Sequence, residues 1–303
     1  MIEKYIRYAF EKSSFLHMLY IKYSYLKYAI KLNLLFNKIS VKKRDVKNLP
    51  DLKKEARIKK NSKRSKVVHI IGSGWSLNKS VDIVDKSDFV IGFNFSPLSM
   101  IDHDIYFIEF GGYKVFETSN FHRILADDIV IPSGGNVYFK NIWHSRNDIQ
   151  YIKNYIKGKY PLIKDYLVPF FSEDHIRQCL EICLKNNSNF LAQKGSTAIS
   201  SVFLAYFFDF KEIVLHGIDF GGGYFFEQED FNGYTIYKES AKKCMYNKNL
   251  QEGKQLHPTA AKKVGIKTIL PILNKILYEK GVNLYTASSM SPSSKILPIY
   301  SKS

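Results

Sequence analysis

Short, almost wholly apolar runs alternate with stretches of helical periodicity over most of the chain after Lys66. Runs of this kind, without an alternating polar face, are typical of strands buried in a parallel sheet. They occur at residues 67–72, 88–94, 104–110, 127–133, 211–220 and 282–288. Helical stretches lie between several of them, most clearly at 197–208 and 260–280. The pattern therefore predicts an α/β fold with an open, mostly parallel sheet and helices on both faces.

The first 40 residues follow another pattern, in which large apolar residues and tyrosines alternate with lysine at short intervals. The longest stretch without a charge covers only residues 13–21, whereas a helix that crosses a membrane needs about 20 apolar residues. A helix here would carry lysines 27, 31 and 38 on one side and an apolar stripe on another. The stripe would consist of Leu19, Tyr23, Leu26, Ile30 and Leu34. Such a helix suits the surface of an anionic membrane.

The formal net charge of +17 is distributed unevenly. Residues 1–66 contain 19 Lys/Arg and 5 Asp/Glu, a net of +14, whereas the other 237 residues contain 26 and 23, a net of +3. We therefore expect a basic helical leader over 1–66, with a solvated linker from 42, and a globular domain over 67–303. The nearly neutral domain argues against a nucleic-acid partner. The alternative to membrane contact is a leader that packs on the domain or on a second subunit of a homo-oligomer.

The number and spacing of the cysteines indicate the cellular compartment. Cys179, Cys183 and Cys244 are too few for a disulfide framework and lack the spacing of a metal site. Cys179 and Cys183 are four residues apart in a helical stretch, which predicts that they pack in the core. These features favour the reducing cytoplasm. Together with the basic leader they predict peripheral attachment to the inner face of the inner membrane.

Candidate binding residues follow the predicted strands, at the carboxyl edge where open α/β sheets bind ligands. The first strand is followed by the turn Gly72-Ser73-Gly74-Trp75-Ser76-Leu77, which would offer backbone N–H groups to an anion. Leu77 takes the place of the third glycine of a dinucleotide fingerprint, and Asn94 that of its acidic residue. The sequence therefore disfavours NAD and FAD. Two interpretations of the turn remain: it binds another phosphate-bearing ligand, or it is a glycine turn that binds no ligand.

Three later segments carry further candidates. Lys194-Gly195-Ser196-Thr197 opens an apolar helix, whose hydroxyls would either cap the helix or hold a phosphate. Gly217-Ile218-Asp219-Phe220 ends a strand, and Asp219 is placed to accept hydrogen bonds from ribose hydroxyls. The glycines and aromatic residues that follow, Tyr224 among them, predict a lid over about 221–256. His257 precedes the last long helix and has the properties of a general base near neutral pH.

In this order the motifs match a known family. GxGxSL at 72–77, an asparagine that ends the second strand, a Ser-Thr pair that opens a helix, GIDF and a late histidine resemble the bacterial CMP-sialic acid-dependent sialyltransferases, glycosyltransferase family 42. The 3-deoxy-ulosonic acid transferases of lipopolysaccharide assembly are similar as well. The resemblance covers roughly residues 66–290. It implies a Rossmann-like domain with a lid, a CMP-sugar donor, no metal or other cofactor, and inversion at the anomeric carbon.

Residue roles follow from the resemblance. His257 would be the general base for the acceptor hydroxyl, and Tyr224 would stabilise the departing phosphate. The positions implied for binding the sugar and the nucleotide are Gly72, Ser73, Gly74, Ser76, Asn94, Glu109, Lys194, Ser196, Thr197, Gly217, Asp219 and Tyr224. Gly221, Lys194 and Glu109 stand where the family has a second lid tyrosine, an arginine and an asparagine. These departures leave open whether the sugar is sialic acid, Kdo or a related ulosonic acid.

The resemblance thus implies transfer of an acidic sugar to a bacterial surface glycan or glycolipid of lipopolysaccharide, lipooligosaccharide or capsule. Asp102-His103-Asp104 matches the metal-binding DxD motif of other glycosyltransferases, but it precedes a predicted strand, so we interpret it as a solvated turn. One alternative is a pterin pyrophosphokinase-like or flagellin-modifying relative, in which Glu109 and Asp219 would bind magnesium. Another is a non-catalytic membrane-associated binding module.

Overall fold

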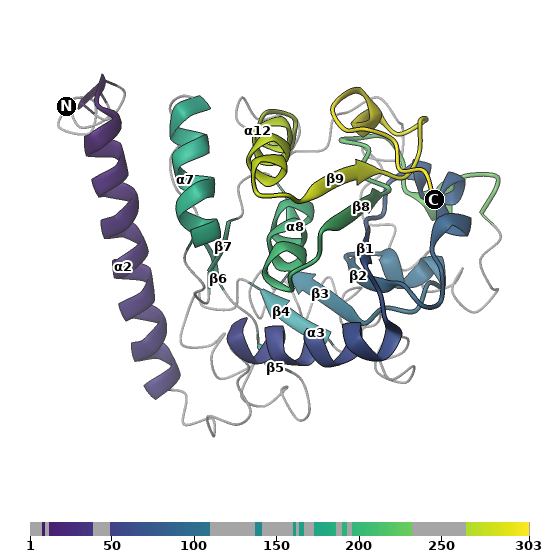
Figure 1. Ribbon diagram of the computed structural model, residues 1–303, viewed down its shortest axis with the longest axis horizontal. Helices are drawn as coiled ribbons and strands as arrows, with labels where there is room; N and C mark the ends of the chain where they lie inside the picture. The colour runs from purple at the N-terminus through teal and green to yellow at the C-terminus, as the bar shows by residue number, and fades with distance from the viewer. Residues whose placement is uncertain are drawn as a thin grey trace.

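A seven-stranded sheet forms the centre of the protein in a computed structural model (Figure 1). The residues described are 8–9, 12–38, 49–109, 137–140, 160–161, 164–166, 173–185, 190–192, 196–231 and 265–302. The strand order is β5-β4-β3-β2-β1-β8-β9, and all neighbours are parallel. The strands are β1 (Val67–Ile71), β2 (Phe89–Phe93), β3 (Ile105–Glu109), β4 (Val137–Lys140), β5 (Tyr160–Pro161), β8 (Glu212–His216) and β9 (Asn283–Thr286). The predicted open, parallel α/β sheet is confirmed.

The apolar runs of the sequence account for most of this sheet. Five of the six predicted runs contain β1, β2, β3, β8 and β9, and the run at 127–133 lies outside the described residues. β4 and β5 were not predicted, because strands of four and two residues are too short to leave a clear apolar pattern. The sequence also gave no sign of a separate parallel pair, β6 (Lys164–Tyr166) and β7 (Phe190–Ala192).

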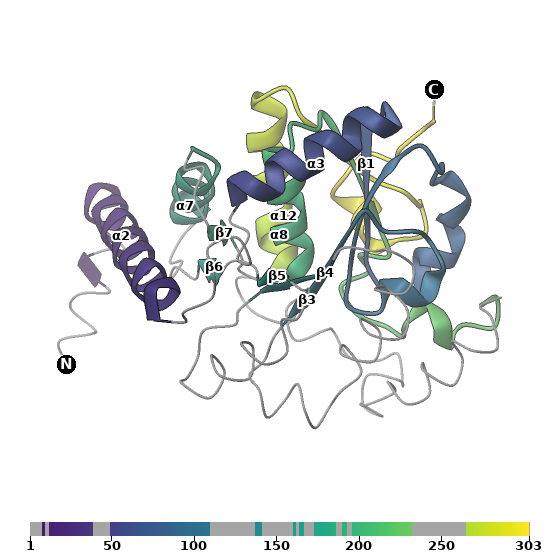
Figure 2. The same ribbon diagram turned by 90° about the horizontal axis from the view of Figure 1, so that it is seen from below.

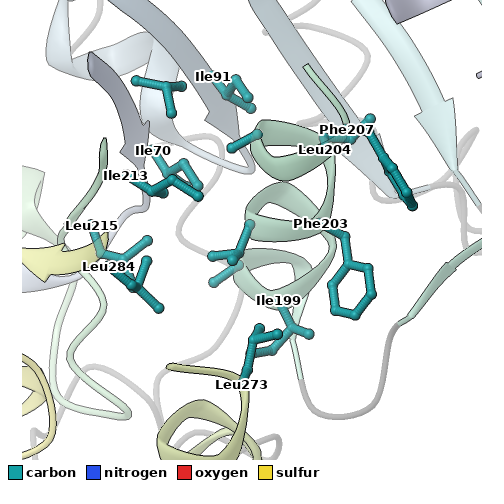
Figure 3. Packing of buried hydrophobic residues seen from close by; sticks show 14 of the residues in the cluster. Ile70, Ile91, Ile199, Phe203, Leu204, Phe207, Ile213, Leu215, Leu273 and Leu284 are labelled. Carbon is teal, nitrogen blue, oxygen red and sulfur yellow. The ribbon is translucent and has the colours of Figure 1, made fainter. Parts of the chain in front are cut away.

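Three of the α-helices that the structure describes pack on one face of the sheet, and two lie further from it (Figure 2). The three are α3 (Leu49–Lys63), α8 (Thr197–Phe207) and α12 (Ile266–Glu279). Helix α7 (Glu173–Lys185) packs on α12, and α2 (Ser14–Lys38) packs on α7. α8 is the central helix, and all its residues except Tyr206 are buried. Ile199 of α8 lies beside Leu273 of α12 (Figure 3), and both belong to the same buried cluster as strand side chains such as Ile70. Burial of this large apolar surface is the main favourable term for the fold.

The opposite face of the sheet is covered, in the part of the chain that the structure describes, by short 3-10 helices. They are η2 (Trp75–Lys79), η3 (Val81–Ile83), η4 (Ser96–Ser99) and η6 (Phe225–Glu227). Successive side chains of a strand point to opposite faces of the sheet. Ile70 therefore belongs to the main core, on the side of α8, whereas Ile71 belongs to a smaller core on the opposite face. The smaller core also contains Leu77 and Phe225, so the elements that follow β1 and β8 share one apolar cluster.

A buried polar chain lies between β1 and β8. His69 Nδ1 and His216 Nε2 are 2.8 Å apart, and both rings are almost fully buried. His69 Nε2 lies 3.1 Å from the carboxylate of Asp88, and His216 Nδ1 lies 3.1 Å from Ser80 Oγ. Each ring nitrogen therefore has a partner, as buried polar groups require. Burial lowers the pKa of His216 well below its usual range, and the neighbouring His69 lowers it further.

Helix α3 belongs to the domain, so the expected solvated linker is wrong for residues 49–66. Its Leu52 and Ala56 are buried in the main core. Its lysines bind acidic and carbonyl groups that lie just before the strands: Lys63 Nζ lies 2.8 Å from an Asp104 carboxylate oxygen, and Lys60 Nζ donates to the Asp209 carbonyl. The sequence pattern suggested a solvated segment because it shows the lysines but not these distant partners.

The expectation of a solvated turn over residues 102–104 is wrong for Asp104, whereas Asp102 is exposed as expected. Asp104 is buried, and its carboxylate accepts hydrogen bonds from Lys63 and from the Val90 N–H. The His103 ring lies so close to Gly92 that a Cβ atom there would be 1.9 Å from its Cδ2 atom. This segment therefore joins α3 to the sheet.

Helix α2 lies along α7 at one end of the molecule, as both views show (Figures 1 and 2). Ile21 is fully buried in the main core, and the His17 ring stacks on that of His175 with 3.6 Å between centroids. The predicted core packing of Cys179 and Cys183 in α7 is confirmed. Among the described residues, no helix has both the length and the apolar content needed to cross a bilayer.

Candidate functional site

The order of the strands creates a switch point between β1 and β8. The chain proceeds from β1 outward through β2, β3, β4 and β5, and later returns to place β8 on the other side of β1. The loops that follow β1 and β8 therefore leave neighbouring strand ends in opposite directions. In open α/β sheets, ligands bind in the crevice at this point. The predicted turn at 72–77 and the GIDF segment at 217–220 are the two loops concerned.

The two loops bind each other through their backbones. The N–H groups of Gly72 and Gly74 donate to the carbonyls of His216 and Gly217, each at 2.9 Å. Gly74 also pairs with Tyr224 in an isolated antiparallel bridge, and the Phe225 N–H donates to the Ser73 carbonyl at 3.2 Å. The start of the predicted lid is thus fastened to the turn after β1.

These contacts change the interpretation of the glycine turn. Besides Gly72 and Gly74, the N–H of Ser76 donates to Asp219 and the N–H of Leu77 donates to the Gly74 carbonyl. The expectation that the turn offers its backbone donors to an anion is therefore wrong for these four groups, because each already has a partner.

The close approach of the loops also explains the glycines. A Cβ atom on Gly72 would lie 2.6 Å from the Gly217 carbonyl oxygen, and one on Gly74 would lie 2.7 Å from the same atom. Gly217 itself has a φ of +59°, a conformation that favours glycine. The three glycines are therefore required by packing and are not by themselves evidence for a ligand.

Asp219 is the anchor of the turn. Its carboxylate accepts hydrogen bonds from the Ser76 N–H at 2.7 Å, the Ser76 hydroxyl at 2.6 Å and the Ser291 hydroxyl at 2.7 Å. The side chain is buried, and burial raises its pKa, although the hydrogen bonds from Ser76 and Ser291 act in the opposite direction. From the sequence, Asp219 was expected to accept hydrogen bonds from ribose hydroxyls and Ser76 to bind the sugar or the nucleotide, whereas here these two side chains bind each other.

A group of buried hydroxyls, which was not predicted from the sequence, continues from Asp219. Ser291 Oγ lies 2.8 Å from Ser293 Oγ, which lies 2.7 Å from Thr286 Oγ1 at the end of β9. All three hydroxyl side chains are buried. The serine-rich stretch at 286–294 was the only signal in the sequence, and it does not identify their partner.

Tyr224 and Asn94 are partly exposed at the same edge. The Tyr224 ring stacks on Phe226 and meets Phe95 edge-on, with centroids 5.2 and 4.7 Å apart. Burial, and to a smaller extent the nearby Glu227, raises the pKa of Tyr224, so its phenol is protonated at neutral pH and can donate a hydrogen bond. Asn94 has a φ of +54°, which is typical of a turn that ends a strand.

The amino end of α8 lies at this edge too. A short turn at 208–211 joins α8 to the start of β8, so the helix runs antiparallel to the strand and its first residues lie near the strand's carboxyl end. Ser196 is the N-cap and accepts a 3.4 Å hydrogen bond from the Ile199 N–H. Thr197 is buried. The capping interpretation of Ser196 is confirmed, and its partly exposed side chain lies at the same edge as Tyr224.

Three of the predicted site residues are described only in part or not at all. Lys194 and His257 lie outside the described residues, as does the predicted lid after residue 231. Glu109 is the last residue of β3, at the carboxyl edge of the sheet. Within the described segments no group of three His, Cys, Asp or Glu side chains is arranged to hold a metal ion.

Comparison with known proteins gives structural neighbours only. No family model and no curated protein matches the chain. The monofunctional α-2,3-sialyltransferase Cst-I from Campylobacter jejuni aligns over 78% of this chain and 80% of its own, with 17% identity and a TM-score of 0.44. The sialyltransferase CstII from the same organism, in complex with the substrate analogue CMP-3FNeuAc, aligns over 77% and 85%, with 17% identity and a TM-score of 0.44. Both of these neighbours are sialyltransferases.

Proposed function

We propose that this chain is a glycosyltransferase that transfers an acidic sugar from a CMP-activated donor. The proposal rests on one observation: motifs that are far apart in the sequence lie close together at the switch point between β1 and β8. The turn at 72–77, Asn94, the GIDF segment and Tyr224 follow three neighbouring strands, and the amino end of α8 lies at the same edge. They occur there in the order of the family 42 motifs, at the position where sheets of this topology bind nucleotides.

The reaction would be an inverting substitution at the anomeric carbon. The acceptor hydroxyl forms the new C–O bond, the bond to the CMP phosphate breaks, and CMP leaves with the electron pair. His257 would take the acceptor proton, a role that contributes typically 10²–10⁴-fold in rate. The phosphate of CMP is already a stable anion, so the reaction as proposed needs hydrogen-bond donors at this phosphate rather than a metal ion.

Side chains would supply these donors, because four backbone N–H groups of the glycine turn already have partners. The Tyr224 phenol is protonated at neutral pH and partly exposed, and the Ser196 hydroxyl lies at the same edge. A well-placed donor of this kind contributes about 3 kcal/mol, by analogy with an oxyanion-hole group. The buried Asp219 network would form the rigid floor under the nucleotide. The proposed acceptor is a bacterial surface glycan or glycolipid.

Calorimetric titration of the full-length protein with CMP, UDP, GDP and ATP tests the nucleotide. We expect a preference for CMP, and Tyr224→Phe should weaken CMP binding by about tenfold while Tyr278→Phe, a change on the exposed face of α12, should have no effect. A clear preference for ATP with magnesium would contradict the proposal and favour the pyrophosphokinase alternative. That alternative is weakened by the three hydrogen bonds that occupy Asp219.

Turnover of CMP-sialic acid and CMP-Kdo, with and without EDTA, tests the reaction. His257→Ala should lower kcat by about 10²-fold or more with CMP binding nearly unchanged. Loss of all activity in EDTA with recovery in manganese would contradict the metal-independent mechanism. The absence of turnover with every CMP-sugar, combined with tight CMP binding, would favour a binding module.

A further inference from the structure

The side chains of α2 that are described and that contact the domain lie on one side of the helix. Ile21 is fully buried in the main core, and His17, four residues earlier, is buried against His175 of α7. Residues four apart lie on the same face of a helix. These contacts fix which side of α2 faces the protein and therefore which side faces outward.

The outward side is an apolar stripe. Its members are Leu16, Leu19, Tyr23, Leu26 and Ile30, with exposed fractions of 40%, 44%, 62%, 59% and 52%. The spacing of three and four residues places them in one line, roughly opposite to Ile21 on the helix at about 100° per residue. Phe15, 62% exposed, lies beside the stripe. The stripe extends over about 20 Å of helix, so it is a continuous surface and not a scatter of single side chains.

Lysines border this stripe. Lys22 and Lys27 are both exposed, and at about 100° per residue they fall on opposite sides of the stripe. Residues 14–38 contain four lysines and no aspartate or glutamate. Tyr23, within the stripe, has the amphipathic side chain that is favoured at the boundary between lipid and water.

Four lysines of α3 contact acidic or carbonyl groups of the domain. Lys53 and Lys60 bind Asp209, and Lys59 and Lys63 bind the segment around Asp104. Burial lowers the pKa of Lys59 and Lys60, which is consistent with groups that pack on the domain. Lys54 of α3 is exposed as well, but the described lysines that border the apolar stripe, Lys22 and Lys27, are on α2.

We infer that the outward stripe of α2 docks on an anionic lipid surface, with the helix lying flat in the interface and the domain held against it by α7. Charge complementarity favours lipid over a second copy of the chain: two α2 stripes face to face would bring their lysine borders together, whereas anionic headgroups would neutralise them. The inference goes beyond the proposed function and does not depend on it, because no residue of the stripe belongs to the candidate site.

Co-sedimentation of the full-length protein with phosphatidylcholine vesicles, with and without 30% phosphatidylglycerol, tests the inference. We expect binding to the anionic vesicles that weakens as salt is raised. The triple variant Leu19→Ser/Leu26→Ser/Ile30→Ser should weaken it by roughly 100-fold, because each side chain has about half of its surface left to bury. Its control, Ile58→Ser/Tyr278→Ser/Met290→Ser, changes three apolar side chains elsewhere with exposed fractions of 56–73% and should bind as the wild type does.

The charge is tested separately. Lys22→Gln/Lys27→Gln should weaken binding roughly 25-fold, about fivefold for each lysine. Lys54→Gln/Lys86→Gln removes the same charge from exposed positions outside α2 and should have little effect. Circular dichroism and thermal unfolding verify that each variant is folded, and CMP affinity should be unchanged in all of them.

Three results would overturn the inference: wild-type protein that binds neutral and anionic vesicles equally, control variants that lose as much binding as the stripe variants, or a stripe variant that binds vesicles normally. A self-associating protein that the triple variant converts to monomers, with vesicle binding unchanged, would show that the stripe is an interface between copies.

Discussion

The most informative single substitution is Asp219→Asn, because the sequence and the structure assign this residue different tasks. If the carboxylate binds the ligand, its replacement should impair binding alone. In the structure it accepts three hydrogen bonds, two from Ser76 and one from Ser291, and so joins the turn after β1 to the segment after β9. We therefore expect Asp219→Asn to impair stability and CMP binding together.

The magnitude follows from those three bonds. A hydrogen bond to a charged group contributes about 1.5–3 kcal/mol, and a buried donor left without a partner costs about 1–3 kcal/mol. Asparagine retains one acceptor oxygen, but its NH₂ group cannot accept from the Ser76 N–H or from a hydroxyl. Loss of the buried negative charge offsets part of this cost, since burial raises the pKa of Asp219. The net loss should be about 2–4 kcal/mol, or roughly 3–6 °C in Tm for a chain of this size.

Urea unfolding and calorimetric CMP titration on the same preparations measure both effects. Asp230→Asn is the matched control, because it removes one carboxylate that binds the same turn through Asn78 but lies on the surface. An exposed pair contributes at most about 1 kcal/mol, so this control should change the free energy of unfolding and the CMP affinity very little. If Asp219→Asn abolished CMP binding with the free energy of unfolding unchanged, the carboxylate would be a ligand-binding group and the anchoring role would be refuted.

Three further predictions test other parts of the structure. Gly74→Ala should destabilise the protein by about 1–3 kcal/mol and weaken CMP binding, measured as above, because its Cβ atom would lie 2.7 Å from the Gly217 carbonyl oxygen. Leu52→Ala should cost about 2–4 kcal/mol in urea unfolding if α3 is part of the domain, whereas a solvated linker would tolerate it. Burial lowers the pKa of His103 to about 3 and that of His216 well below 6.5, so the unfolded state takes up more protons in mild acid. The free energy of unfolding should therefore fall by about 2–3 kcal/mol between pH 7 and pH 5.5, and a pH-independent value would contradict the burial of these rings.

The sheet could be predicted because its signal is local. A strand buried on both faces, such as β1 or β8, consists of consecutive apolar residues, and a run of this kind is visible without any knowledge of its neighbours. The carboxyl ends of parallel strands share one edge, so the position of the site also followed from the sequence. β4 and β5 are short and belong to the sheet only through their pairing, which no local pattern reveals.

Side-chain partners could not be predicted in this way. Ser76 and Asp219 are 143 residues apart, and Asp219 and Ser291 are 72 apart, so the bonds that anchor the turn join three distant segments. The same holds for Lys63 and Asp104. In each case the sequence shows a polar residue in a plausible functional position, and solvent or a ligand is the natural first assignment. The fold supplies an internal partner instead.

The site therefore has two parts that should respond differently to mutation. Ser76 and Asp219 are buried, each satisfies the other, and both lie in the contact between two loops, so a change there must disturb the position of the loops before it affects any ligand. Asn94, Ser196 and Tyr224 are partly exposed at the same edge. The changes Asn94→Asp, Ser196→Asp and Tyr224→Phe alter a potential contact there but still suit the left-handed turn, the helix cap and the ring packing, so they cost the fold little. A substitution series should then show stability and CMP affinity falling together for the buried pair and affinity falling alone for the exposed residues. Such a separation would also distinguish a built nucleotide site from a glycine turn that serves only to pack β1 against β8, because in the second case the exposed residues would have no effect on CMP binding.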